Sequence, residues 1–334
     1  MKRGYDAFPV CVWSGKGFRS RRRSKRGDIL IFNQTGEVQD GFFVIGSPHV
    51  PLYVLKSEKP VIFEGGVSLL GELYRRELVA LLGRVQPWMI LLTHVHFDHC
   101  GAVSHLKKAF PGMKVAASPE SAAILKRPNA VRLIRALSEN AWESVMGIDE
   151  ALLLQDAFEP FDVDRVVREG DRIEIHGGLT VRVLSTPGHT RDFLSYYIPE
   201  KKILVASEAG GCAVNKGYIS VDCLTDFDIY VNSLRRLASL DAEILCQGHR
   251  YVYTDRDVQA FFERSIRSTL EFKEMVEECW HQESHDLKRV IARIKALEYD
   301  PLPRPKQPEL AYLANLEARV KSIITIPPHL TLRE

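Results

Sequence analysis

The feature that most constrains this chain is the hexapeptide HVHFDH, residues 94–99, which directly follows the apolar run WMILLT. A continuous apolar run of this length is typical of a strand that is buried on both faces. His94 and His96 alternate at its end, so their side chains point to the same side. Asp98 and His99 follow at the start of the next predicted helix, where a turn can aim them at a second point nearby. Imidazole and carboxylate groups together suit zinc, iron or manganese, and no thiolate cluster in the sequence indicates a structural zinc site.

Three other strand ends supply further candidate ligands. His189 lies in the turn STPGHT after the run LTVRVL, Glu208 follows the run KILVAS, and His249 follows the run EILC. Because each comes soon after an apolar or β-branched run, all three can gather with residues 94–99 on one edge of a sandwich. The other histidines lack this context, and we expect them to be structural or solvated: His49, His105, His176, His281, His285 and His329.

The order of the predicted elements indicates the fold class. Short β-branched and aromatic runs, broken by Gly, Pro, Asn and Ser, begin at residue 28 and predict a meander of strands. Helical periodicity follows in LGELYRRELVALLGRV, and a second series of strands begins near residue 164. Two β-rich halves that each supply outer helices predict an α/β (α+β) fold, a four-layer αββα sandwich. We assign this body to residues 28–254.

The segments on either side of the body differ from it in composition. Residues 1–27 hold nine Lys or Arg against one acid, Asp6. Such a basic arm can bind nucleic acid or an anionic surface, but the body has no matching basic stripe, so we expect a solvated arm and no nucleic-acid partner. Residues 255–334 form a predicted helical extension, in which the Pro-rich stretch 300–308 separates the last helix. We expect these helices to form a lid over the site or the contact of a homodimer.

Length and composition set the remaining bounds. The 334 residues, 45% hydrophobic and 26% charged, are typical of a soluble globular protein. No apolar stretch approaches the roughly 20 residues of a membrane helix, so no membrane partner is expected. No apolar signal region is visible at the N-terminus, and the six cysteines are scattered without paired spacing. These features predict a cytoplasmic protein with reduced thiols.

With these motifs in place, HVHFDH, PGHT and GH resemble, in this order and context, the metallo-β-lactamase superfamily over residues 28–255. The resemblance implies an αββα fold with a dinuclear site for two divalent metal ions. Zinc is the metal expected first, and iron and manganese are the alternatives. Matched motif by motif, the first metal would be held by His94, His96 and His189, the second by Asp98, His99 and His249, and the bridging position by Glu208.

Two residues depart from the family's pattern. Glu208 stands where an aspartate is usual, and one extra methylene changes how a carboxylate reaches two ions. Glu64, in VIFEGG, stands where many relatives have an aspartate beneath the metals, so we expect it to orient a ligating histidine. The short second loop and the DH pair are similar to the thioesterase and lactonase side of the superfamily. VIFEGG and LLTHVHFDHCG together resemble the quinolone-signal response proteins, which have thioesterase activity and C-terminal helices over the site.

The resemblance implies a hydrolase that attacks its substrate with a metal-bound hydroxide, oriented by Asp98 as the catalytic residue. The expected substrate is a small molecule with a bulky acyl group: a thioester such as an acyl-coenzyme A, or an ester or lactone. One alternative is a phosphodiesterase or ribonuclease, which the basic arm would favour. The other is a signalling protein with a drifted metal site, whose helical tail binds partners. The H-x-H opening argues against the redox subgroup of the superfamily, which has a glutamate at the second position.

The preference for an acyl group rests on apolar side chains of the tail and of the helix predicted near residues 130–146. If several of them face the metals, the pocket is apolar and suits an acyl or aromatic group. The candidates are Leu133, Leu137, Trp142, Met146, Phe261, Phe262, Phe272, Met275 and Trp280.

Overall fold

The computed structural model of the chain describes residues 31–32, 36–141, 145, 148–154, 158–215, 218–302 and 309–324. The basic arm of residues 1–27 lies outside the described residues, as do His329 and two candidate pocket residues, Trp142 and Met146.

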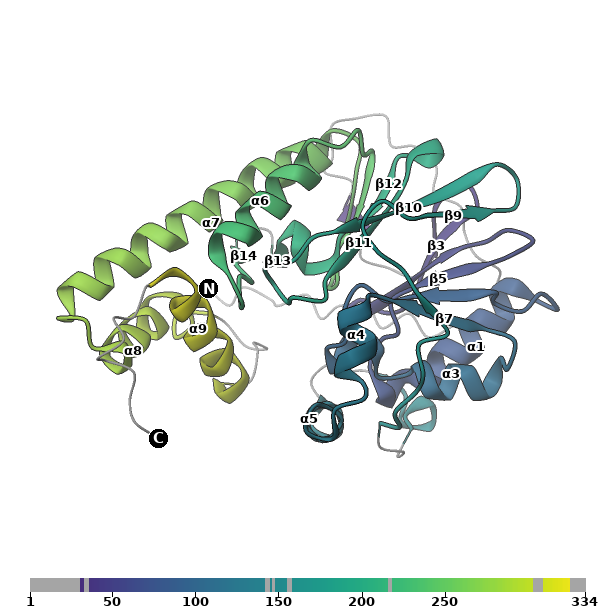
Figure 1. The fold of residues 1–334 in the computed structure, drawn as a ribbon, viewed down its shortest axis with the longest axis horizontal. Helices are drawn as coiled ribbons and strands as arrows, with labels where there is room; N and C mark the ends of the chain where they lie inside the picture. Colours follow the sequence, from purple (N-terminus) through teal and green to yellow (C-terminus); the bar gives the residue numbers. More distant parts are fainter. Residues whose placement is uncertain are drawn as a thin grey trace, which may run out of the picture.

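Two seven-stranded sheets lie face to face across the described part of the chain (Figure 1). The first sheet has the spatial order β2 (Gly36–Gln39), β3 (Phe42–Ser47), β4 (Val50–Leu55), β5 (Val61–Phe63), β6 (Met89–Leu91), β7 (Lys114–Ala117) and β8 (Arg165–Val166). The second has the order β1 (Ile31–Phe32), β16 (Val252–Thr254), β15 (Ile244–Cys246), β12 (Ile203–Val205), β11 (Leu194–Ile198), β10 (Leu179–Ser185) and β9 (Arg172–Ile175). A separate hairpin is formed by β13 (Cys212–Asn215) and β14 (Tyr218–Ser220).

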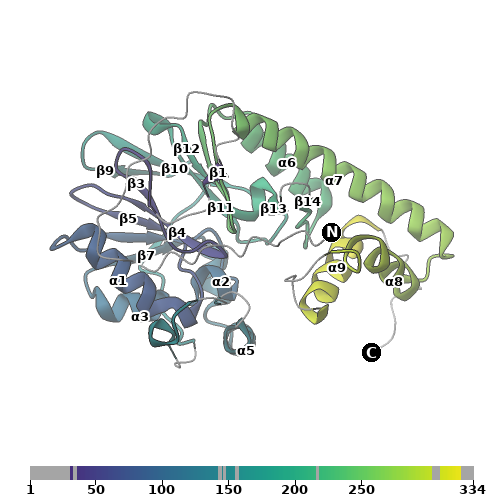
Figure 2. The ribbon, with the colours of Figure 1, turned by 180° about the vertical axis from the view of Figure 1, so that it is seen from behind.

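Helices cover the outer face of each sheet (Figure 1, Figure 2). α1 and α3 pack beside the first sheet, and α6 and α7 pack beside the second. The helices of the described residues are α1 (Gly71–Leu82), α2 (Phe97–Cys100), α3 (Val103–Ala109), α4 (Pro119–Ile124), α5 (Pro128–Glu139), α6 (Phe227–Ala238), α7 (Arg256–Gln282), α8 (Leu287–Glu298) and α9 (Glu309–Ile323).

Alternating side chains on the central strands build the layers. In β6, Met89 and Leu91 join the core between the two sheets, whereas Ile90 joins the core under α1 and α3. In β12, Ile203 likewise faces the other sheet, and Leu204 faces the helices. Because both faces of these strands are apolar and successive side chains point to opposite faces, each sheet is covered on both sides. The predicted four-layer αββα sandwich is confirmed.

Strand direction brings the predicted ligands to one edge. β6 runs parallel to β5 and β7, so their carboxyl ends share an edge of the first sheet. In the second sheet β11 runs antiparallel to both β10 and β12, and β12 runs parallel to β15. The carboxyl ends of β10, β12 and β15 therefore share an edge as well, and each of them precedes a predicted ligand.

The C-terminal helices extend to one side of the sandwich (Figure 2). α7 packs on β16, α6 and β14, and α8 and α9 pack on α7. Phe261 stacks on Tyr253 with ring centroids 4.3 Å apart, and Phe262 and Phe272 are buried in the same core. These three aromatics belong to the core shared by the extension and the second sheet. No helix of the described residues is long and apolar enough to cross a membrane.

Candidate metal centre

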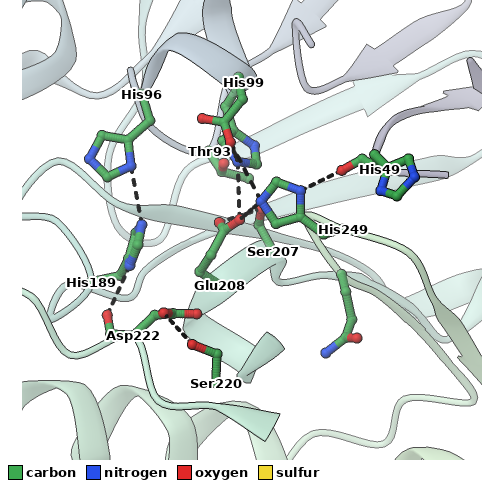
Figure 3. Close-up of polar contacts among 12 residues, drawn as sticks. His49, Thr93, His96, His99, His189, Ser207, Glu208, Ser220, Asp222 and His249 are labelled. Carbon is green, nitrogen blue, oxygen red and sulfur yellow. Dashed lines mark hydrogen bonds and ion pairs between the residues drawn. The ribbon is translucent and has the colours of Figure 1, made fainter. Parts of the chain in front are cut away.

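The structure brings all seven predicted ligands together at the shared edge of the two sheets, and Figure 3 labels five of them: His96, His99, His189, Glu208 and His249. They come from the segments after four strands: β6, β10, β12 and β15. His94, His99, His189 and Glu208 are buried, while His96, Asp98 and His249 are partly exposed. The site is therefore open to solvent on the side of α2, which carries Asp98.

A first group consists of His94, His96 and His189. One ring nitrogen from each lies within 4.8 Å of the other two. His189 Nε2 and His96 Nδ1 are 3.3 Å apart, so these two rings present nitrogen atoms to a common point. This is the set that the resemblance assigns to the first metal.

A second group consists of Asp98, His99 and His249, whose ligand atoms also lie within 4.8 Å of one another. The Asp98 Oδ2 atom is 3.8 Å from His99 Nε2 and 3.6 Å from His249 Nε2. The Asp98 side chain keeps 18% of its surface exposed, so this carboxylate faces both the group and the solvent.

Glu208 lies between the two groups. Its Oε1 atom is 3.0 Å from His99 Nε2 and 3.0 Å from His249 Nε2, and it also forms a compact set with His94 and His99. Its Oε2 atom accepts a hydrogen bond from the Ser207 hydroxyl at 2.8 Å. The carboxylate thus leans towards the second group while it remains next to His94 of the first.

The extra methylene of Glu208 is accommodated by a glycine. A Cβ atom added at Gly248 would overlap Glu208 Oε1 and would lie 2.6 Å from Ser207 Oγ. Real Cβ atoms do not approach other atoms this closely, so the residue before His249 has no room for a side chain.

Fixed hydrogen bonds orient the rings of three histidines. His189 Nδ1 donates to the Asp222 carbonyl oxygen at 2.8 Å, and His249 Nδ1 donates to the His49 carbonyl oxygen at 2.5 Å. The Thr93 hydroxyl lies 3.0 Å from His94 Nδ1. A ring whose Nδ1 carries the proton keeps the lone pair on Nε2, which is the form that ligates a metal.

Glu64 fixes the contact between the Thr93 hydroxyl and His94. Its carboxylate accepts from the Thr93 hydroxyl at 2.8 Å, so the Thr93 oxygen is left to accept from His94. Glu64 Oε2 is also 3.3 Å from His99 Nδ1. Glu64 therefore contacts His99 directly and His94 through Thr93, in line with the orienting role expected for it. The sequence analysis missed Thr93, whose only signal was its place directly before the HVHFDH motif.

Asp192 supports the backbone of the motif and was also missed. Its buried Oδ2 atom accepts from the backbone N–H of Val95 at 3.1 Å and from the Ser121 hydroxyl at 2.7 Å. The N–H that it binds lies between His94 and His96, so Asp192 ties the turn that presents both rings to α4.

Electrostatics divide the histidines into two kinds. Burial, together with the neighbouring His99, lowers the pKa of His94 well below its usual value, and burial with His189 lowers the pKa of His96 to about 4. Burial alone would also lower the pKa of His99 and His249, but the Glu208 carboxylate raises both. His94 and His96 are thus neutral near pH 7, the form in which imidazole binds a metal.

Backbone strain concentrates around the site. Glu64, Ser207 and Arg250 have φ angles of 71°, 47° and 66°, in the left-handed region that non-glycine residues rarely adopt. Two of them are direct neighbours of Glu208 and His249. Such conformations cost about 1–3 kcal/mol each and persist where the surroundings enforce them.

The residues fit a divalent metal ion. Among the described residues, the buried His94 Nε2 atom has no hydrogen-bond partner. Buried polar atoms without a partner are rare because each carries a desolvation cost, and a bound cation would supply the missing interaction. Nitrogen and carboxylate donors of this kind suit zinc, iron and manganese.

The four-layer fold, with imidazole and carboxylate groups at one edge, defines the class of αββα proteins with a metal site between their sheets. Within that class, the chain belongs to the metallo-beta-lactamase superfamily, whose sequence model matches residues 52–249.

Known proteins support this assignment. The chain is 30% identical over 168 residues to a hydroxyacylglutathione hydrolase of Rhodopseudomonas palustris (strain BisB5). This match covers 48% of each of the two chains. It is 26% identical over 160 residues to an atrochrysone carboxyl ACP thioesterase of Aspergillus fumigatus, 48% of this chain and 37% of the relative. The chain thus spans about half the length or less of these relatives. A metallo-beta-lactamase family protein of Thermus thermophilus has a similar fold, with a TM-score of 0.58, 20% identity and coverage of 85% and 92%.

Proposed function

We propose that the protein is a metal-dependent hydrolase that cleaves an acyl thioester or ester. His94, His96 and His189 hold one divalent ion, Asp98, His99 and His249 hold the other, and Glu208 lies between them. The observation that carries the proposal is the set of fixed rings: His94, His189 and His249 each have a partner on Nδ1 and direct Nε2 into the site.

When bound, two divalent ions would lower the pKa of water towards neutrality and polarise a substrate carbonyl oxygen. Asp98 would orient the attacking water while it binds the second ion, because its carboxylate is the partly exposed acid of the site and faces the second group. Glu64 and Thr93 keep the His94 ring in place during this step. Asp192 holds the backbone between His94 and His96.

The side chains around the site favour attack by water over attack by a protein nucleophile. Burial raises the pKa of the Cys100, Cys212 and Cys246 thiols well above the usual value, so these thiols remain protonated and unreactive. The hydroxyl of Ser207 is buried and donates to Glu208. A substrate acyl group therefore meets no activated thiol or hydroxyl among these neighbours.

The choice of an acyl substrate rests on α5 and on the relatives. α5 packs against α2, the helix that carries Asp98. Leu133 and Leu137, one turn apart on α5, are 60% and 41% exposed and offer an apolar surface beside the site. Two of the relatives are named as a hydroxyacylglutathione hydrolase and an ACP thioesterase. An acyl group on the thiol of glutathione or of an acyl carrier is a thioester, so both names support this substrate class.

The test is turnover by protein loaded in turn with Zn, Mn and Fe(II), on acyl-coenzyme A esters, acyl-glutathiones, lactones and a phosphodiester. Metal content is measured on the same samples. We expect metal-dependent cleavage of a thioester or ester. Phosphodiester cleavage without acyl turnover would replace the substrate class by the nuclease alternative. Full metal loading without any turnover would favour a signalling protein.

We also propose that the C-terminal helices form a homodimer contact. Leu297 on α8 and Leu310 on α9 are 57% and 84% exposed, so both helices present an apolar side chain that a second copy of the chain would cover. Sedimentation equilibrium tests this contact, and a monomer at all concentrations that is unchanged by Leu310→Asp would contradict it.

A further inference from the structure

The last described helix, α9, reaches the loop that follows the β13–β14 hairpin. The Ser322 hydroxyl lies 2.7 Å from the Cys223 carbonyl oxygen and 2.8 Å from the Arg319 carbonyl oxygen of its own helix, and its single proton is shared between these two acceptors. Arg319 Nη1 lies 3.5 Å from the Val221 carbonyl oxygen. Val221 and Cys223 are buried. α9 therefore holds residues 221–223 from two sides of their central residue, Asp222.

Asp222 is also the partner of a proposed metal ligand. Its carbonyl oxygen accepts the hydrogen bond from His189 Nδ1 at 2.8 Å (Figure 3). Since this bond sets both the tautomer and the angle of the His189 ring, a shift of the Asp222 carbonyl would move His189 Nε2 away from His96. Asp222 thus lies directly between the two residues that α9 contacts, Val221 and Cys223, and it binds His189 itself.

Arg319 is fixed firmly enough to define the position of this loop. Its side chain is 2% exposed, and Arg319 Nη2 lies 2.8 Å from Glu298 Oε2 on α8. The Tyr312 hydroxyl donates to the same Glu298 carboxylate at 2.7 Å. The guanidinium group lies 4.7 Å from the centre of the Phe272 ring on α7. A buried charge held by an ion pair and an aromatic face has little freedom to move, so α7, α8 and α9 share one rigid anchor.

We propose that Arg319 and Ser322 are positioning residues for the metal centre: through residues 221–223 they set the orientation of His189. The inference rests on the proposed function, because it takes His189 to be a metal ligand. It assigns the C-terminal extension a role that does not require it to cover the site. A purely structural role would change the stability of the extension and leave the metal affinity of the folded protein unchanged.

The experiment measures metal binding by the full-length protein and by three variants. Ser322→Ala removes one hydrogen bond from a partly exposed side chain and is expected to fold. Arg319→Met removes the anchor. The matched control is Val290→Ala on α8, which truncates a fully buried side chain with no polar atom to offer residues 221–223. The readouts are metal affinity, from competition with a chelator, and the d–d absorption of the Co(II)-loaded protein, which reports the ligand geometry.

We expect Ser322→Ala to weaken one of two metal-binding steps by about 3- to 10-fold and to shift the Co(II) spectrum, with the other step unchanged. Arg319→Met should do the same to a greater extent. Val290→Ala should lower the melting temperature while it leaves affinity and spectrum as in the wild type. Wild-type affinity and spectrum in Ser322→Ala would overturn the inference even if Arg319→Met fails to fold. Wild-type protein that binds no metal would overturn the proposed function and this inference together.

Discussion

Gly248→Ala tests whether Glu208 serves as a ligand in the position that the structure gives it. The new Cβ would overlap Glu208 Oε1 and would lie 2.6 Å from Ser207 Oγ and 2.8 Å from Glu208 Cδ. Because Glu208 and Ser207 are both buried, neither can move aside without displacing other groups. Overpacking of this kind costs about 1–3 kcal/mol.

The effect should appear in metal affinity. If the carboxylate swings away to relieve the overlap, it gives up its place 3.0 Å from His99 and His249. Since about 1.4 kcal/mol corresponds to a tenfold change in binding, a cost of about 1–3 kcal/mol should weaken one metal-binding step of Gly248→Ala by about 5- to 150-fold. Isothermal titration with Zn and a competing chelator measures this change. Gly112→Ala is the matched control, because a Cβ there meets only Gln86 Oε1, at 3.9 Å.

A second substitution separates this mechanism from general damage. Glu208→Asp shortens the side chain by the methylene that crowds residue 248, so Gly248→Ala combined with Glu208→Asp should recover part of the lost affinity. Neighbouring residues that share an overlap are expected to be non-additive in this way. Wild-type affinity in Gly248→Ala would refute the reasoning. So would a double variant that binds no better than Gly248→Ala alone.

Three further sets of substitutions test the site and its surroundings. Glu208→Gln should lower the occupancy of at least one metal site, because a neutral amide binds a hard cation more weakly than a carboxylate; unchanged metal content by mass spectrometry would place Glu208 outside the ligand set. The double variant His96→Ala/His249→Ala should lose most bound metal and most activity, and full metal retention would contradict the ligand assignment. Burial raises the pKa of Glu77 from 4.5 to about 7, although its carboxylate accepts from the Gly46 N–H at 2.5 Å. The folded state therefore favours the protonated acid. The resulting contribution to the free energy of unfolding is complete below pH 4.5 and is lost as the pH rises through 7. One pKa unit corresponds to about 1.4 kcal/mol, and since Glu77 is partly exposed we expect a loss of about 1–2 kcal/mol. Urea unfolding of Glu77→Gln should lack this pH dependence between pH 4.5 and 7, and an unchanged slope would argue against it.

The sequence predicted the convergence of the seven side chains because few residue types can serve as ligands and each of them follows a strand. His94 and His189 lie far apart in the chain, yet parallel and antiparallel pairing leaves the ends of β6 and β10 at one edge. Buried strands have no polar positions within them, so a histidine at the end of such a strand stands out in the sequence. The same reasoning predicted the αββα layers from apolar runs alone.

Short and irregular elements were missed for a physical reason. The β13–β14 hairpin and β16 are built from strands of three or four residues that lack the continuous apolar run by which equally short strands such as β6 were predicted. The environment of the α7 aromatics was not predictable for another reason. A helical stripe such as Phe261 and Phe272 looks the same in the sequence whether it faces a substrate or the core, and only the packing of α7 on β16, α8 and α9 decides between them.

The groups that orient the histidine rings could not be predicted from the sequence. His189 and His249 are turned by the carbonyl oxygens of Asp222 and His49, and a carbonyl oxygen is present in every residue. No side-chain pattern can reveal such a partner, because its identity depends on where the backbone runs. Yet these two bonds decide which ring nitrogen faces the proposed metal site. The proposed ligands can therefore be picked out in the sequence, whereas their orientation depends on loops such as 221–223, which α9 contacts. If the positioning role proposed for α9 holds, variation in the C-terminal helices would alter the centre while every proposed ligand stays the same.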